Sequence, residues 1–119
     1  MEITYFIAGK RFEAKNTNDL NSKLAKYELV TNLDETGLGN LTVRKLSDPI
    51  GESRYEMVQS HGDPADFDGY DICVGTVIAN NGYGQPEVAE VNLSEIEKIL
   101  AEVRMDIPDA NLLVGSYRS

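Results

Sequence analysis

The chain is poor in the residues that cross-link small folds. Its 119 residues include one cysteine, one histidine and no tryptophan. One cysteine cannot form an internal disulfide, and no Cys/His cluster has the spacing of a structural zinc site. We therefore expect an ordinary hydrophobic core to stabilise the fold, with no metal and no cofactor.

Long hydrophobic runs are also missing. Residues 1–9 carry an acid at position 2 and no basic residue, and their apolar run is too short for a signal peptide. No segment approaches the roughly 18 apolar residues that a membrane helix needs. A lone thiol suits a reducing compartment. These features predict a soluble, cytoplasmic protein that does not enter a membrane.

Basic residues are scarce in the second half of the chain. The formal net charge is −9, from 11 basic and 20 acidic residues. No Lys or Arg lies between Arg54 and Lys98, whereas that interval contains nine acids. Such an interval forms either a solvated face or an electronegative surface that attracts a basic partner. It disfavours direct binding to nucleic acid, which depends on clustered Lys and Arg.

The composition is that of a globular protein, with 41% hydrophobic and 26% charged residues. The length predicts one domain over residues 1–119. Strand-like segments outnumber helical ones and do not alternate with them. This order predicts an α+β fold, an antiparallel or mixed sheet of about five to seven strands with two helices packed on it.

The first elements are expected to be a hairpin and a helix. Residues 2–15 predict a β-hairpin that turns at Gly9-Lys10, because a two-residue loop with glycine first suits a type II′ turn. A short strand is an alternative for residues 27–31. After the predicted hairpin, apolar residues recur at helical spacing and predict a helix with one apolar face: Leu20, Leu24 and Tyr27.

The rest of the chain predicts strands and one long helix. Residues 72–79 are apolar on both faces, which is typical of a central strand that is covered on both sides or crosses under a helix. The helix over 93–105 should bury a stripe against that strand: Ile96, Ile99, Leu100 and Val103. The other predicted strands are 41–46, 54–59, 87–91 and 112–117.

The acidic interval supplies the candidate binding residues. Four aspartates lie within residues 63–71, but the spacing fails as an EF-hand, because Val74 stands where a glutamate is needed. We interpret the loop as solvated or as a partner contact. A predicted turn over residues 80–84 offers an exposed tyrosine as an interface anchor. The predicted partner-binding residues are Asp63, Asp66, Asp68, Asp71, Tyr70, Tyr83, Glu87 and Glu90.

Catalytic and phosphate-binding patterns are weak. His61, Asp63 and Cys73 could form a triad on paper, but Cys73 sits in an apolar strand, where cysteine usually acts as a small buried hydrophobe. We predict no catalytic residue. The glycines over 80–84 lack the Lys-Ser/Thr of a P-loop. Arg44 and Arg54 form either a small anion site or cross-strand pairs with Glu52 and Glu56.

Four functional hypotheses remain open. The first is a non-catalytic inhibitor or immunity-type protein whose acidic surface blocks a basic partner, such as a nuclease toxin or a nucleic-acid-handling enzyme. The second is a small-molecule or nucleotide-binding domain. The third is a small enzyme that uses His61 and acidic loop residues. The fourth is a structural or assembly subunit. The sequence does not specify an oligomeric state.

Overall fold

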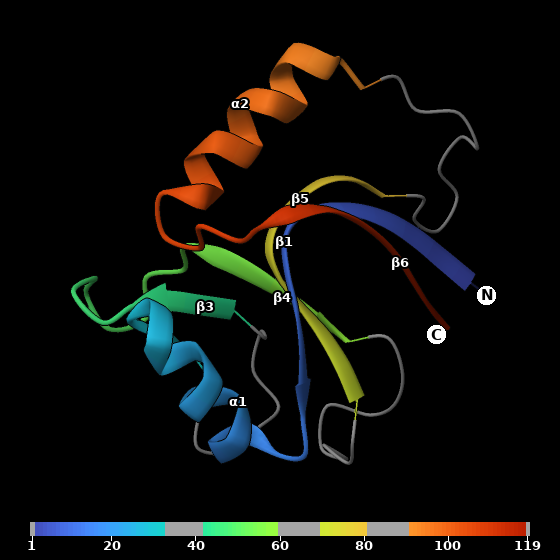
Figure 1. Ribbon diagram of the computed structural model, residues 1–119. Helices are drawn as coiled ribbons and strands as arrows, with labels where there is room; N and C mark the ends of the chain where they lie inside the picture. The colour runs from blue at the N-terminus through green and yellow to red at the C-terminus, as the bar shows by residue number, and fades with distance from the viewer. Residues whose placement is uncertain (1, 33–41, 60–69, 81–90, 119) are drawn as a thin grey trace.

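A computed structural model describes residues 2–32, 42–59, 70–80 and 91–118. These residues form one antiparallel sheet in the order β2-β3-β4-β5-β1-β6, with two helices, which confirms the predicted α+β fold (Figure 1). The elements are β1 (Glu2–Ala14), α1 (Thr17–Leu24), the 3-10 turn η1 (Ala25–Tyr27), β2 (Leu29–Thr31), β3 (Thr42–Lys45), β4 (Tyr55–Gln59), β5 (Tyr70–Asn80), α2 (Leu93–Arg104) and β6 (Asn111–Arg118).

The predicted N-terminal hairpin is wrong. β1 runs through Gly9 without turning and pairs with β5 on one side and β6 on the other. Gly9 lies opposite Gly75, and a Cβ on either residue would collide with the backbone of the other strand. The two glycines therefore permit a close approach of two strands, which is a second use of glycine besides tight turns.

The first helix forms where its spacing indicates. The side chain of Asn16 accepts a hydrogen bond from the backbone N–H of Asp19 at 2.8 Å, which caps the helix N-terminus. Leu20 and Leu24 are completely buried. Glu28 then adopts a left-handed conformation at φ 59° and ends η1, so that the chain enters the short strand β2.

The second helix is less well covered than predicted. Of its apolar stripe, only Val103 is buried, whereas Ile96, Ile99 and Leu100 are half-buried. The buried residues continue past the helix end with Ile107 and Ala110. The sheet thus covers α2 mainly at its C-terminal end.

Both helices pack on the same face of the sheet, because their buried residues join one core cluster. In β5 that face holds Ile72 and Val74, which are fully buried. Cys73 and Val77 point to the other face and are only half-buried. β5 is therefore an inner strand, as predicted, but its two faces are not equally covered.

Candidate functional site

The predicted partner-binding residues fall largely outside the described residues. This holds for Asp63, Asp66, Asp68, Tyr83, Glu87 and Glu90, and for His61, the histidine of the alternative enzyme hypothesis. Tyr70 and Asp71 are the first two residues of β5, where their backbones pair with Ala14 and Glu13 of β1. That position is at one end of the sheet.

Two segments that contain acids and lie outside the described residues, 33–41 and 60–69, connect to strands at this same end of the sheet. β2 ends at Thr31, which pairs with Val43 of β3, and β3 begins at Thr42, which pairs with Glu56 near the start of β4. β4 ends and β5 begins further in the same direction, where Gln59 pairs with Ile72. Segments 33–41 and 60–69 therefore leave from neighbouring strands at one end, whereas 81–90 follows the opposite end of β5.

Charge is divided unevenly between these segments and the rest of the chain. Residues 2–32, 42–59, 70–80 and 91–118 carry all eleven bases and thirteen acids, a formal charge of −2. The other residues contribute −7, with no Lys or Arg. Their acids are Asp34, Glu35, Asp63, Asp66, Asp68, Glu87 and Glu90.

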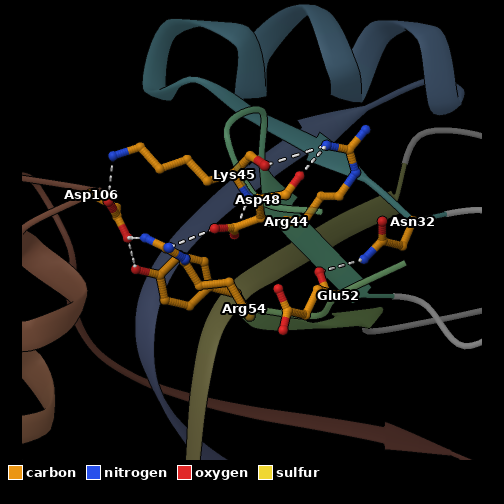
Figure 2. A network of polar contacts seen from close by, with 8 residues as sticks. Asn32, Arg44, Lys45, Asp48, Glu52, Arg54 and Asp106 are labelled. Carbon is orange, nitrogen blue, oxygen red and sulfur yellow. Dashed lines mark hydrogen bonds and ion pairs between the residues drawn. The ribbon is translucent and has the colours of Figure 1, made fainter. Parts of the chain in front are cut away.

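A second group of charges lies between β3, β4 and the end of α2, and it neutralises itself. Figure 2 shows Lys45 and Arg54 converging on the carboxylate of Asp106, while the guanidinium of Arg44 points away from it. Lys45 Nζ and Arg54 Nη1 each lie 3.1 Å from Asp106, and the Tyr55 hydroxyl also donates to it. Arg54 further pairs with Asp48 at 2.7 Å.

This cluster alters the acidity of its members. Burial, reinforced by the hydrogen bond to Asp106, raises the pKa of Tyr55 far above its ordinary value. Burial opposes the ionisation of Asp106, but hydrogen bonds from Tyr55, Lys45 and Arg54 together outweigh it and hold its pKa below 3.8. Asp106 is therefore an ionised residue that joins the end of α2 to two strands.

The predicted role of Arg54 is consequently wrong. It pairs with Asp48 and Asp106 rather than with Glu52 or Glu56, so its charge is already compensated. Arg44 donates to the backbone carbonyls of Lys45 and Asp48 at 3.4 Å. Both arginines contact Asp48, Arg44 at its backbone carbonyl and Arg54 at its carboxylate, and they do not form a common anion site.

An open cleft of about 500 Å³ lies between the second half of β1 and α1 with its 3-10 turn. Its lining includes four cationic side chains, although the whole chain has only eleven. They are Lys10, Arg11, Lys23 and Lys26. Phe12 and Tyr27 add aromatic surface, and their rings meet edge to face with centroids 6.1 Å apart.

Asp109 joins this cleft to the chain segment after α2. It accepts from Lys10 Nζ at 2.5 Å and from the Tyr27 hydroxyl at 2.9 Å. The hydrogen bond from Lys10 lowers the pKa of Asp109, and the same contact raises the pKa of Lys10. Lys26 lies beside the Tyr27 ring, with Nζ 5.6 Å from the ring centroid.

The remaining predictions concern chemistry. Cys73 is half-buried, not buried as predicted, because it lies on the less covered face of β5. Among the residues that the structure describes, no group of His, Cys, Asp and Glu is arranged to hold a metal ion. Within those same ranges, no helix has the length and apolar character needed to cross a membrane.

Sequence reasoning missed Asp106 and Asp109. Both flank the buried Ile107 just after α2, where the chain runs against the sheet. A signal was present: acids on either side of an apolar residue, directly after a helix, suggest contacts with basic residues on neighbouring strands. The identity of those bases depends on strand order, which the sequence does not specify.

Comparison with known proteins gave no match: no family model, no curated protein and no solved structure resembles the chain.

Proposed function

We propose that this protein is a non-catalytic inhibitor or immunity-type protein that blocks a basic partner through acidic segments 33–41 and 60–69. The supporting observation is the division of charge. Residues 2–32, 42–59, 70–80 and 91–118 carry every Lys and Arg and a formal charge of −2, whereas segments 33–41, 60–69 and 81–90 carry seven acids and no Lys or Arg. A basic nuclease or another nucleic-acid-handling enzyme has the complementary surface.

The anchors of these segments support a single binding end. Segments 33–41 and 60–69 leave from neighbouring strands at one end of the sheet, and Asp71 is the second residue of β5 there. Concentrated like charge costs stability through self-repulsion, and a basic partner would relieve that cost. Asp63, Asp66, Asp68 and Asp71 would then steer encounter, with Tyr70 available as an aromatic anchor. Tyr83, Glu87 and Glu90 would form a separate, secondary contact at the opposite end of β5.

The test compares capture by two variants with the same change in charge. Asp63, Asp66 and Asp68 are changed to Lys in one, and Glu56, Glu97 and Glu102, which are exposed, in the other. Each protein is immobilised, exposed to native lysate and eluted with stepped salt. We expect a basic protein that wild type and the second variant capture and the first loses, with a slower association rate in surface plasmon resonance.

Equal capture by both variants would reduce the acidic segments to a solvated face and contradict the proposal. Binding that survives high salt would do the same, because screening shortens the Debye length to about 3 Å at 1 M salt. Circular dichroism confirms that each variant folds before its binding is compared.

The cleft favours a second candidate function, the binding of an aromatic anion such as a nucleotide. Its volume of about 500 Å³ is that of a small-ligand site. Asp109 and Asp19 partly compensate Lys10 and Lys23. Glu13, which also lines the cleft, pairs with Arg11 at 3.4 Å, so the cleft beside the Tyr27 ring is weakly positive. A planar base against Tyr27 with a phosphate toward Lys26 fits this chemistry.

Calorimetric titration with adenosine monophosphate, adenosine and inorganic phosphate tests this candidate. The monophosphate should bind most tightly, and Lys26→Ala should weaken it severalfold. Lys98→Ala removes an exposed lysine of α2 and should leave binding unchanged. No heat with any of the three compounds would exclude a nucleotide site here.

A further inference from the structure

The two edges of the sheet differ in how they are protected against pairing. β2 is an edge of three residues, whereas β6 is an edge of eight. Long exposed edges are normally protected by lysine, proline, inward charges or a bulge. The β6 sequence NLLVGSYR contains no lysine, proline or acid, and its pairing with β1 has no register shift.

The β6 edge also exposes apolar side chains on one face. Phe6 pairs with Val114, and Ala8 pairs with Leu112, so these four residues share a face. Ala8 belongs to the core beneath the helices, which identifies this as the helix-bearing face. Phe6 is 40% exposed, Leu112 42% and Val114 65%. The apolar surface thus extends from the core to the rim of the sheet.

Charge favours a second copy of the same chain as the occupant. A molecule with net charge −9 repels its own copy. β6 has no acid in its eight residues and one base at its end, Arg118, so its own residues add no negative charge to this repulsion. A strand edge is also self-complementary, because two identical strands pair antiparallel about a two-fold axis.

We infer that β6 pairs antiparallel with β6 of a second copy, so that the sheet continues across both molecules. The two-fold axis of such a pair is perpendicular to the sheet, and the helix-bearing faces of both copies lie on the same side. In the register centred on Leu113, Leu112 of one copy lies opposite Val114 of the other, and these pairs bury the apolar rim.

The expected dimer is weak. Eight residues span about 27 Å of strand edge, which places the contact at the low end of specific interfaces. We therefore expect a dissociation constant in the micromolar range or above. At low protein concentration, the molecular mass measured in solution should be that of the monomer.

Sedimentation velocity from about 1 µM to about 1 mM protein tests the inference. Val114→Lys places a charge on the β6 rim, and Ile50→Lys makes the same change at a residue that is 91% exposed and lies outside β6. We expect wild type and Ile50→Lys to dimerise alike, and Val114→Lys to weaken the dimer by about tenfold or more. Circular dichroism checks that both variants fold.

Salt gives a second, independent readout. Screening reduces repulsion between two copies of charge −9, so added salt should strengthen this dimer, whereas it should weaken binding to a basic partner. A monomer at every concentration would overturn the inference, and so would a dimer that Val114→Lys leaves intact. Neither result bears on the proposed acidic interface.

Discussion

The two helices lie on the same face of one sheet, yet they are held differently. α1 has eight residues and buries Leu20 and Leu24 completely. α2 has twelve residues and a more regular apolar stripe, but within the helix only Val103 is buried. Apolar spacing therefore shows which face of a helix turns inward and says little about how much of that face is covered.

The attachment of α2 is concentrated at its C-terminal end. There Val103, Ile107 and Ala110 enter the core, and Asp106 binds Lys45 and Arg54. Its first turn carries Leu93, which is 75% exposed. A helix that is anchored at one end is expected to loosen progressively toward the other end.

The largest expected effect is on α1. Leu24→Ala should lower the free energy of unfolding by about 2–5 kcal/mol, because it removes a completely buried side chain from the core. Chemical denaturation followed by circular dichroism measures the change. A loss below about 0.5 kcal/mol would mean that α1 is not fixed on the sheet as described.

Asp106→Asn should have the next largest effect, about 1–3 kcal/mol, since it leaves Lys45 and Arg54 without their shared carboxylate. The effect should depend on pH. The pKa of Asp106 is lowered in the fold, so its stabilisation is present above its ordinary value of 3.8 and is lost as the pH falls through the folded value.

Denaturation at about pH 6 and about pH 3 checks this dependence. Acid should destabilise the wild type more than Asp106→Asn. Equal losses in both proteins would show that Asp106 does not titrate as part of the network.

Leu100→Ala should cost less than Leu24→Ala, about 1 kcal/mol, because Leu100 is only half-buried. The pair of leucine variants is matched in chemistry and differs only in burial. Equal losses for the two would contradict the difference between the helices.

Hydrogen exchange should show the difference within α2 itself. Amides near Glu97 should exchange faster than amides near Arg104, because the buried contacts lie at the C-terminal end. Mass spectrometry of peptides from the native protein measures this gradient, and Asp106→Asn should flatten it. Uniform protection along α2 would mean that its first turns are as firmly held as its last.

The smallest effect is expected at Cys73. Cys73→Ala should change the free energy of unfolding by less than about 1 kcal/mol, because the side chain is half-buried on the less covered face of β5. Binding to the partner should be unaffected. A loss of binding with the fold intact would favour a chemical role for the thiol and contradict a non-catalytic protein.

The sequence predicted the elements better than their connections. Local patterns of strand-forming residues predicted β3, β4, β5 and β6, with β5 apolar on both faces, because side-chain direction in a strand depends only on neighbouring residues. The hairpin at Gly9 failed because glycine serves both turns and close approaches. Only the presence of Gly75 on the adjacent strand distinguishes the two uses.

The same limit applies to the candidate sites. Asp106 depends on Lys45 and Arg54, which come close only after the strands are ordered. The acidic interval was visible in the sequence because it is a property of composition. Whether Asp66 and Asp68 meet a partner remains a prediction, since they lie outside the described residues.

The pairing of β1 with β6 has a consequence for how the chain folds. Glu2 lies opposite Arg118, so β1 finds one of its two neighbours more than 100 residues later in the sequence, a separation of roughly the whole described chain. Contacts this distant in sequence slow folding, because a long loop must close before they form. At about 5–20 residues per second, one edge of β1 stays unpaired on the ribosome for several seconds or more. During that time the unpaired edge of β1 can pair with other nascent chains. A chaperone that binds extended strands would bind at this edge.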